Sequence, residues 1–169
     1  RPIKTQVVEL NLQNYPTRIN TQGNVRPHNQ ITLNSEVSGR IIELHPNFED
    51  GAFFNRGDIL VTLDPADFKA AVLTAEAQLA RMTAAYDMEK AQAQQAKENW
   101  ERFESDEEPD DLVLRLPQLR EAEANMNAAS AGLERAKRNL ERTQIQAPFN
   151  GRVRERNVGL GQAIRINSP

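Results

Sequence analysis

The tetrapeptide Ser38-Gly39-Arg40-Ile41 recurs in altered form as Asn150-Gly151-Arg152-Val153. Both copies lie in short runs of apolar and turn-forming residues, whereas no glycine occurs between Gly57 and Gly132. Because short strand pairs cannot bury an apolar face alone, the two related halves predict one flattened β domain, with each half supplying about half of the core. The glycine-free stretch between the halves predicts a long helical insertion.

The strands of the first half are predicted from alternating apolar and polar residues. The alternation predicts a strand over Ile31–Val37, an interruption at Gly39 and a resumption over Arg40–Leu44. Turn signals follow at Asp50-Gly51 and at residues 55–58. The remaining short apolar runs are Phe53-Phe54, Ile59–Leu63 and, after the insertion, Gln162–Ile164.

A heptad pattern predicts that the insertion consists of two helices paired along an apolar seam. Asp64 is suited to cap the first helix and Pro65 to its first position. The four-three spacing is typical of a left-handed coiled coil, and only Glu89 interrupts its apolar character. The predicted seam residues of the first helix are Phe68, Val72, Ala75, Leu79, Met82, Tyr86, Glu89, Ala93, Ala96, Trp100 and Phe103. Those of the return helix are Leu112, Leu116, Leu119, Ala122, Met126, Ala129, Leu133, Ala136, Leu140 and Thr143.

The turn between the helices is predicted from an acidic, proline-containing stretch. Two helices of matched length, the first of about 40 residues and about 60 Å, would turn back near Ser105–Asp110. The rhythm of the return helix slips between Leu119 and Ala122, close to Pro117. Since proline lacks the amide donor, this predicts either a kink or a first turn that starts late.

Composition and motifs exclude several classes of function. A net charge of −3 gives no electrostatic reason to propose nucleic acid. The absence of cysteine excludes disulfides, thiolate zinc sites and cysteine nucleophiles. His28 and His45 lack partners at ligand spacing, and there is no phosphate loop, nucleophile elbow or paired carboxylate in a pocket-forming context. The sequence therefore predicts no catalytic site, metal or cofactor.

No apolar run reaches the length that crosses a bilayer, and no signal peptide is recognisable. The chain begins at Arg1-Pro2 and stops at Ser168-Pro169, directly after an apolar pattern. We therefore expect a fragment of a longer protein, with any membrane anchor outside it.

Three segments resemble a known family. The stretch Asn139–Val153 (Asn-Leu-Glu-Arg-Thr-Gln-Ile-Gln-Ala-Pro-Phe-Asn-Gly-Arg-Val) resembles the signature of periplasmic adaptor proteins, also called membrane fusion proteins. Val37–Ile41 and Gly57–Pro65 resemble the first half of their lipoyl-like domain and its exit into a hairpin. The resemblance covers Gly23 to Ile166 and is specific in the ordered combination of its motifs.

The resemblance implies an α+β fold: a lipoyl-like (barrel-sandwich hybrid) β domain split by a long antiparallel α-helical coiled-coil hairpin. Residues 23–63 and 145–169 would form the two halves of the domain, and residues 64–144 the hairpin. Residues 1–22 would supply N-terminal strands leading to β-barrel and membrane-proximal domains that lie mostly beyond this chain.

The implied function is that of a non-enzymatic adaptor of the HlyD-like, RND-type family in the periplasm, anchored to the inner membrane. It would link an inner-membrane transporter, often of the resistance-nodulation-division (RND) type, to an outer-membrane channel for the export of small molecules. The β domains would assemble into a ring, and the hairpins would engage the channel. Alternatives are an adaptor for an ABC-type exporter or type I secretion system, and a passive coiled-coil scaffold.

The resemblance places the channel contact at the hairpin tip. Multidrug adaptors often carry arginine, leucine four residues on and serine seven beyond that; aligning Arg102 with the arginine puts Asp106 and Val113 in the other places, a departure that leaves the channel's identity open. The candidate contact residues are Arg102, Asp106, Glu107, Glu108, Asp110 and Leu112.

Other candidates keep more than one interpretation. Arg152, Arg154 and Arg156 would share one face of a strand, either as its solvent side or as a ring contact between adaptors. Glu89 is a register-setting residue, an inter-subunit contact or, as we favour, a carboxylate whose stem packs while its head reaches water. A swinging-arm carrier is disfavoured because the position of the modified lysine falls at Asp67, at the start of the predicted helix.

Overall fold

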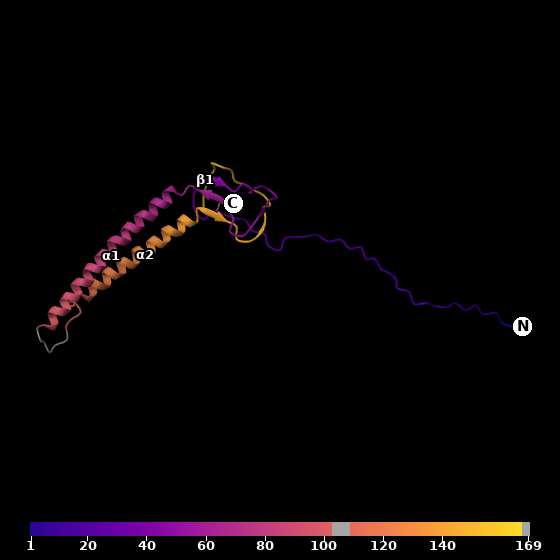
Figure 1. Ribbon diagram of the computed structural model, residues 1–169, viewed down its shortest axis with the longest axis horizontal. Coiled ribbons are helices and arrows are strands. Elements are labelled where there is room, and N and C mark those ends of the chain that lie inside the picture. Colours follow the sequence, from indigo (N-terminus) through magenta and orange to yellow (C-terminus); the bar gives the residue numbers. More distant parts are fainter. Residues whose placement is uncertain (103–108, 167–169) are drawn as a thin grey trace. The chain divides into compact units, whose positions relative to one another are not determined.

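The computed structural model describes residues 1–102 and 109–166 and divides the chain into two units, Arg1–Ile31 and Thr32–Pro169. The first unit contains no helix or strand. The second contains every element of regular structure in the described ranges (Figure 1). The strands predicted within residues 1–22 would pair with segments outside this chain, so that prediction remains untested.

Strands from both halves combine in the β unit. The first half contributes β1 (Gly39–Leu44), β2 (Phe53–Phe54) and β3 (Ile59–Leu63). The second half contributes β4 (Gln144–Gln146), β5 (Gly151–Arg152) and β6 (Ala163–Ile164). One sheet has the order β4-β3-β1-β6, and β2 pairs with β5, all antiparallel. Each sheet therefore joins the two halves, which confirms that they fold as one unit.

The core of the β unit is supplied unequally by the two halves. Its buried residues are Val37, Ile41, Leu60, Val61, Leu63, Ala147 and Ile164. The first half provides five of these seven, so the prediction of equal contributions is wrong. The reason is strand length: β1 and β3 have 6 and 5 residues, whereas β5 and β6 have 2 each.

The strand predicted over Ile31–Val37 is absent, and β1 begins at Gly39 instead of being interrupted there. Ser35 and Val37 are buried, and the Ser35 hydroxyl donates to the Val37 carbonyl at 2.5 Å. Only the end of the alternating stretch is therefore packed, since Ile31 and Leu33 are 54% and 36% exposed. Glycine suits position 39 because a Cβ there would lie 3.3 Å from the Cβ of Leu63.

The two helices differ in length. Helix α1 spans Ala66–Glu101 (36 residues) and α2 spans Leu116–Glu141 (26 residues), so the prediction of matched helices is wrong. The Asp64 carboxylate accepts a hydrogen bond from the Ala66 amide at 3.0 Å, in the capping role predicted for it, although the helix starts one residue later than expected. Pro117 lies in the first turn of α2, which confirms the late start rather than a kink.

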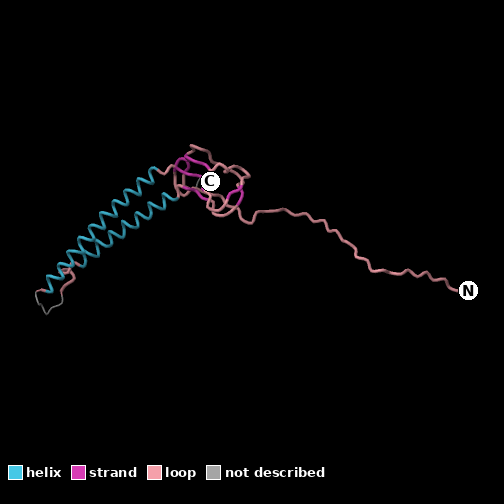
Figure 2. Tube along the Cα trace, in the orientation of Figure 1, coloured by secondary structure: helices cyan, strands magenta, loops and turns pink. Residues whose placement is uncertain are grey.

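The helices lie side by side (Figure 2) and share the seam predicted from the heptads. Each predicted seam residue within α1 and α2 is buried or half-buried, including Ala93, Ala122 and Leu133, which are buried. Leu112, which precedes α2, is exposed, and Phe103 lies outside the described residues. The packing confirms the pairing, and the left-handed supercoil remains a prediction.

The insertion leaves and re-enters the β unit at one place. The Leu63 amide donates to the Thr143 carbonyl at 2.8 Å, and the buried Thr143 hydroxyl donates to the Leu140 carbonyl at 2.7 Å. At the same place, Phe68 of α1 packs against the core of the β unit. These contacts position the far end of the helical pair relative to the β unit.

Candidate functional site

The described part of the candidate site is the segment by which the chain enters α2. Glu89 of α1 and Arg115, the residue before α2, form a two-pronged ion pair. Arg115 Nη2 lies 3.0 Å from Glu89 Oε1 and 2.8 Å from Oε2, and Nε lies 3.3 Å from Oε2. Helix α2 therefore begins opposite Glu89, and twelve residues of α1, about 18 Å of helix, continue past it to Glu101.

Residues 110–115 form tight turns ahead of α2. The amides of Val113 and Leu114 donate to the Asp110 carbonyl at 2.9 and 3.2 Å, and the Leu116 amide donates to the Asp111 carbonyl at 3.0 Å. Arg115 has a φ of 56°, the left-handed region that side chains with a Cβ adopt at a cost. Its carbonyl then accepts from the Leu119 amide at 3.0 Å, so the reversal at Arg115 leads directly into the helix.

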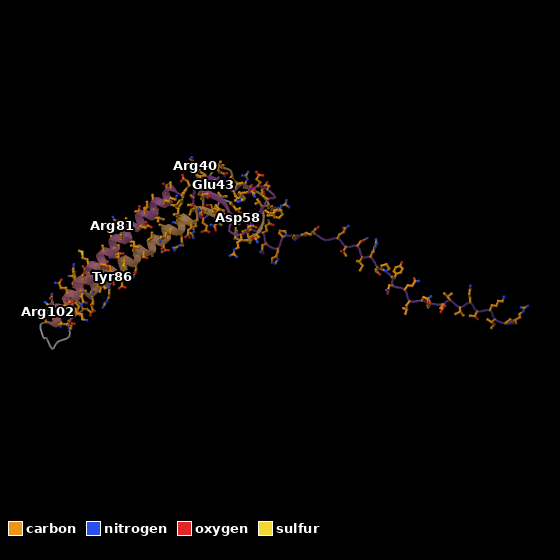
Figure 3. All side chains as sticks on the ribbon, in the orientation of Figure 1. Arg40, Glu43, Asp58, Arg81, Tyr86 and Arg102 are labelled. Carbon is orange, nitrogen blue, oxygen red and sulfur yellow. The ribbon has the colours of Figure 1, made fainter. Side chains whose placement is uncertain are left out.

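The surface of this end combines acidic, basic and apolar groups. Arg102 directly follows α1 and is exposed (Figure 3). Leu112 and Val113 are 62% and 46% exposed, so two neighbouring aliphatic side chains are accessible to solvent at this end. Asp111 pairs with Arg120 at 3.0 Å in the solvent.

The predicted contact residues are thus described only in part. Arg102, Asp110 and Leu112 are exposed as a contact requires, and the Asp110 carbonyl accepts the amides of the turn that follows it. Asp106, Glu107 and Glu108 lie outside the described residues. The role of all six in binding remains a prediction.

A cleft of about 370 Å³ lies between the helices, next to the Glu89–Arg115 pair. Its lining includes thioether, amide and carboxylate groups: Met82, Ala85, Met88, Glu89, Gln118, Glu121, Ala122 and Asn125. Small alanine side chains leave this space open. Within the described ranges no three His, Cys, Asp or Glu side chains gather in a way that would hold a metal ion.

Arg115 was not predicted from the sequence, and the interpretation favoured for Glu89 was wrong. The favoured interpretation had the Glu89 head reaching water, whereas it binds the Arg115 guanidinium across the helix pair. A signal was present, because a carboxylate in an apolar seam requires a cation or water. The spacing did not reveal which arginine would supply it, since Arg115 precedes the helix.

The three arginines proposed for ring packing do not share a strand face. Strand β5 ends at Arg152, and Arg154 and Arg156 follow it in irregular, exposed chain. The Arg152 Nε donates to the Gly51 carbonyl at 2.5 Å, and its guanidinium lies 5.4 Å from the centre of the Phe53 ring. Val153 still bonds with Ala52 and Gly51, but Arg154 and Arg156 lie beyond this pairing, so the common strand face predicted for these arginines is wrong.

The position of a carrier lysine is occupied by helix. Asp67 lies in the first turn of α1, and Lys69 is exposed on the same helix. An exposed hairpin tip, which covalent attachment would require, is therefore not formed there. Among residues 1–102 and 109–166, no helix combines the length and the apolar content needed to cross a membrane.

Comparison with known proteins gives a family match and similar relatives. Residues 29–169 match the family described as the barrel-sandwich hybrid domain of RND membrane fusion proteins. The uncharacterised protein YdhJ of Escherichia coli K12 is 35% identical over 142 residues, covering 83% of this chain and 47% of YdhJ. The multidrug resistance protein MdtA of Salmonella typhimurium is 31% identical over 164 residues, covering 94% of this chain and 38% of MdtA. The chain thus spans less than half of either relative.

Solved structures of efflux proteins are also similar to this chain. A chimera of MacA and MexA that contains the α-hairpin domain of Pseudomonas aeruginosa MexA matches with a TM-score of 0.56 and 27% identity, over 84% of this chain and 44% of the chimera. A putative efflux transporter from Bacteroides eggerthii matches with a TM-score of 0.51 and 26% identity, over 80% of this chain and 36% of that protein. With two halves joined in one β unit, paired helices inserted between them and a family match over residues 29–169, the chain belongs to the barrel-sandwich hybrid domains of RND membrane fusion proteins.

Proposed function

We propose that this chain is the central part of a periplasmic adaptor that links an inner-membrane efflux transporter of the RND type to an outer-membrane channel. The observation that carries the proposal is the family match over residues 29–169, which includes both β halves and the inserted helices. Relatives such as MdtA are named for multidrug resistance, which supports small molecules as the exported substrates. The role is mechanical coupling without catalysis, as expected of a family of adaptor proteins.

Each part of the chain has a separate task in this proposal. The β unit packs beside its copies in a ring, and residues 64–144 present the contact end to the channel. Residues 1–22 supply strands to domains outside the chain, which anchor the protein to the inner membrane. The exposed apolar residues of that segment, which include Val8, Leu10 and Leu12 at alternate positions, suit a strand that awaits a partner sheet.

A ring would strengthen a weak channel contact. Once one adaptor is bound, each further contact forms at the effective concentration set by the ring, so affinity rises without any new type of interaction. A pair of packed helices keeps that concentration high because it holds the contact end at a constant distance from the β unit.

The test exchanges the contact end for that of an adaptor with a different channel partner. Replacing residues 102–113 in the full-length protein should transfer crosslinking from the original channel to the donor's channel, while helicity stays the same. A control carrying Asp87→Asn and Glu123→Gln, both on exposed mid-helix positions, should retain the original channel. Continued pairing of the exchanged protein with the original channel would refute the assignment.

The transporter class is tested separately by purifying the full-length protein from membranes and identifying the co-purifying transporter. An RND-type transporter supports the proposal. An ATP-driven exporter in its place would overturn the RND assignment while leaving the adaptor role intact.

A further inference from the structure

The apolar seam does not define how α1 and α2 align along their length. On α2 the seam alanines Ala122, Ala129 and Ala136 are spaced by seven, and so are the larger residues Met126, Leu133 and Leu140. The base of α2 is held by the Leu63–Thr143 contact, so only its distal part could move along α1. If that part moved by one heptad, about 10 Å, α2 would present the same order of small and large residues to α1. The repeat along α2 therefore does not by itself define where its distal part lies on α1.

One polar group breaks this repetition. Glu89 is the single carboxylate among the α1 seam positions, and its side chain is 25% exposed. In the observed register it meets the Arg115 guanidinium, which is 37% exposed, through both oxygens. In a register shifted by seven residues, the pair separates and Glu89 faces an apolar seam. A polar residue inside an otherwise apolar seam is an established means of selecting one alignment.

Arg115 combines this side-chain contact with an unusual backbone. It is the one residue other than glycine with a positive φ in the ranges described, and it directly precedes α2. A left-handed residue with a Cβ persists where surrounding contacts hold it. The planar fork of the guanidinium fits a carboxylate in two-pronged fashion, so the contact fixes the side chain in direction as well as in position.

We propose that the Glu89–Arg115 pair sets the register of α2 on α1, with Arg115 as a positioning residue that directs the chain between residues 109 and 115. The cleft of about 370 Å³ beside the pair supports this, because the helices are not closely packed at that level. The register inference goes beyond the proposed adaptor role and stands without it. Its consequence for channel contact does rest on the proposed function.

The register is measured as a distance between the helices in the full-length protein, in the absence of any channel. The chain contains no cysteine, so spin labels attached through Ala77→Cys and Ala128→Cys, both at exposed positions, report on α1 and α2 alone. With Glu89 and Arg115 intact, we expect one narrow distance distribution. Glu89→Gln removes the charge while preserving size, and should add a second population displaced by several ångströms, up to about 10 Å.

Arg115→Gly separates the two properties of Arg115. Glycine adopts a positive φ freely, so this variant permits the backbone reversal while it removes the whole side chain, including the guanidinium. It should broaden the distribution as Glu89→Gln does, whereas the exchanged pair Glu89→Arg with Arg115→Glu should restore a single narrow distance. The matched control is Asp111→Asn, which removes the neighbouring but solvent-exposed pair with Arg120 and should leave the distance unchanged.

Narrow, wild-type distances in both Glu89→Gln and Arg115→Gly would overturn the inference. Equal broadening of the distance distribution in Asp111→Asn would also overturn it, because the loss of any charge at this end would then have the same effect. Circular dichroism of each variant establishes that the helices remain folded. A shifted register with unchanged channel crosslinking would leave the register role standing and count against the channel contact at this end, so the two proposals fail separately.

Discussion

The β unit and the helical pair are stabilised in different ways, although one chain forms both. In the β unit, Ile41 and Leu63 are 1% and 0% exposed, and strands from both halves enclose them. Along the two helices, burial is reached only at Ala93, Ala122 and Leu133 within the described residues. A compact core thus holds the base, and a narrow seam of small residues holds the extension. A substitution should therefore have a larger effect at the base than along the seam.

The largest effect is expected in the β core. Leu63→Ala removes a fully buried side chain and should lower the free energy of unfolding by about 2–5 kcal/mol, measured by urea denaturation. Leu73→Ala changes an exposed leucine of α1 and should stay within about 0.5 kcal/mol. Similar losses in the two variants would show that the β unit lacks the core described here.

A smaller but still substantial effect is expected in the seam. Leu133→Asp places an unpaired charge in the interface between the helices, and should cost about 2 kcal/mol or more. Hydrogen exchange should rise in α1 and α2 while the β unit stays protected, because the seam and the core share few contacts. Ala131→Asp adds the same charge at an exposed position of α2 and should leave exchange and thermal melting unchanged. Unaltered helicity and melting in Leu133→Asp would contradict the seam.

Two glycines sharpen the contrast with the smallest changes. A Cβ at Gly151 would lie 2.8 Å from the Phe54 ring and 3.2 Å from that of Phe149, so Gly151→Ala should destabilise the β unit by about 1–3 kcal/mol. A Cβ at Gly132 in α2 meets nothing within 4 Å, so Gly132→Ala should stabilise the protein by about 0.5–1 kcal/mol. Thermal melting of both variants measures these opposite signs, and a shared sign would refute the comparison.

The two regions also differ in how much of them the sequence revealed. The seam was predicted residue by residue, because a helix brings positions three and four apart together without help from elsewhere. In the β unit, the strand at Ile59–Leu63 was predicted correctly, whereas the strand at Ile31–Val37 was not. A strand requires a neighbouring strand to bond with, and alternation alone does not show that one is present. The turn at Asp50-Gly51 was found from its composition, whereas the Arg152 side chain that closes over it was not.

The turn between the helices was predicted from the acidic composition near Ser105–Asp110, and its role in channel contact remains a prediction. The contact that shapes the entry into α2 joins Glu89 to Arg115, outside that stretch. The heptad pattern is confined to helical residues, so it predicts no partner for a residue that precedes α2. To predict such a pair from sequence, each carboxylate in an apolar seam has to be matched with a cation that could form an ion pair with it.

The hydrogen bond from Leu63 to Thr143 has a consequence for how such proteins diverge. The insertion leaves and re-enters the β unit at neighbouring residues. Seven residues added to each helix would therefore lengthen the helical pair by about 10 Å without changing the β unit. The length of the helical pair can therefore change in steps of one heptad, while the strands of the β unit evolve under separate constraints.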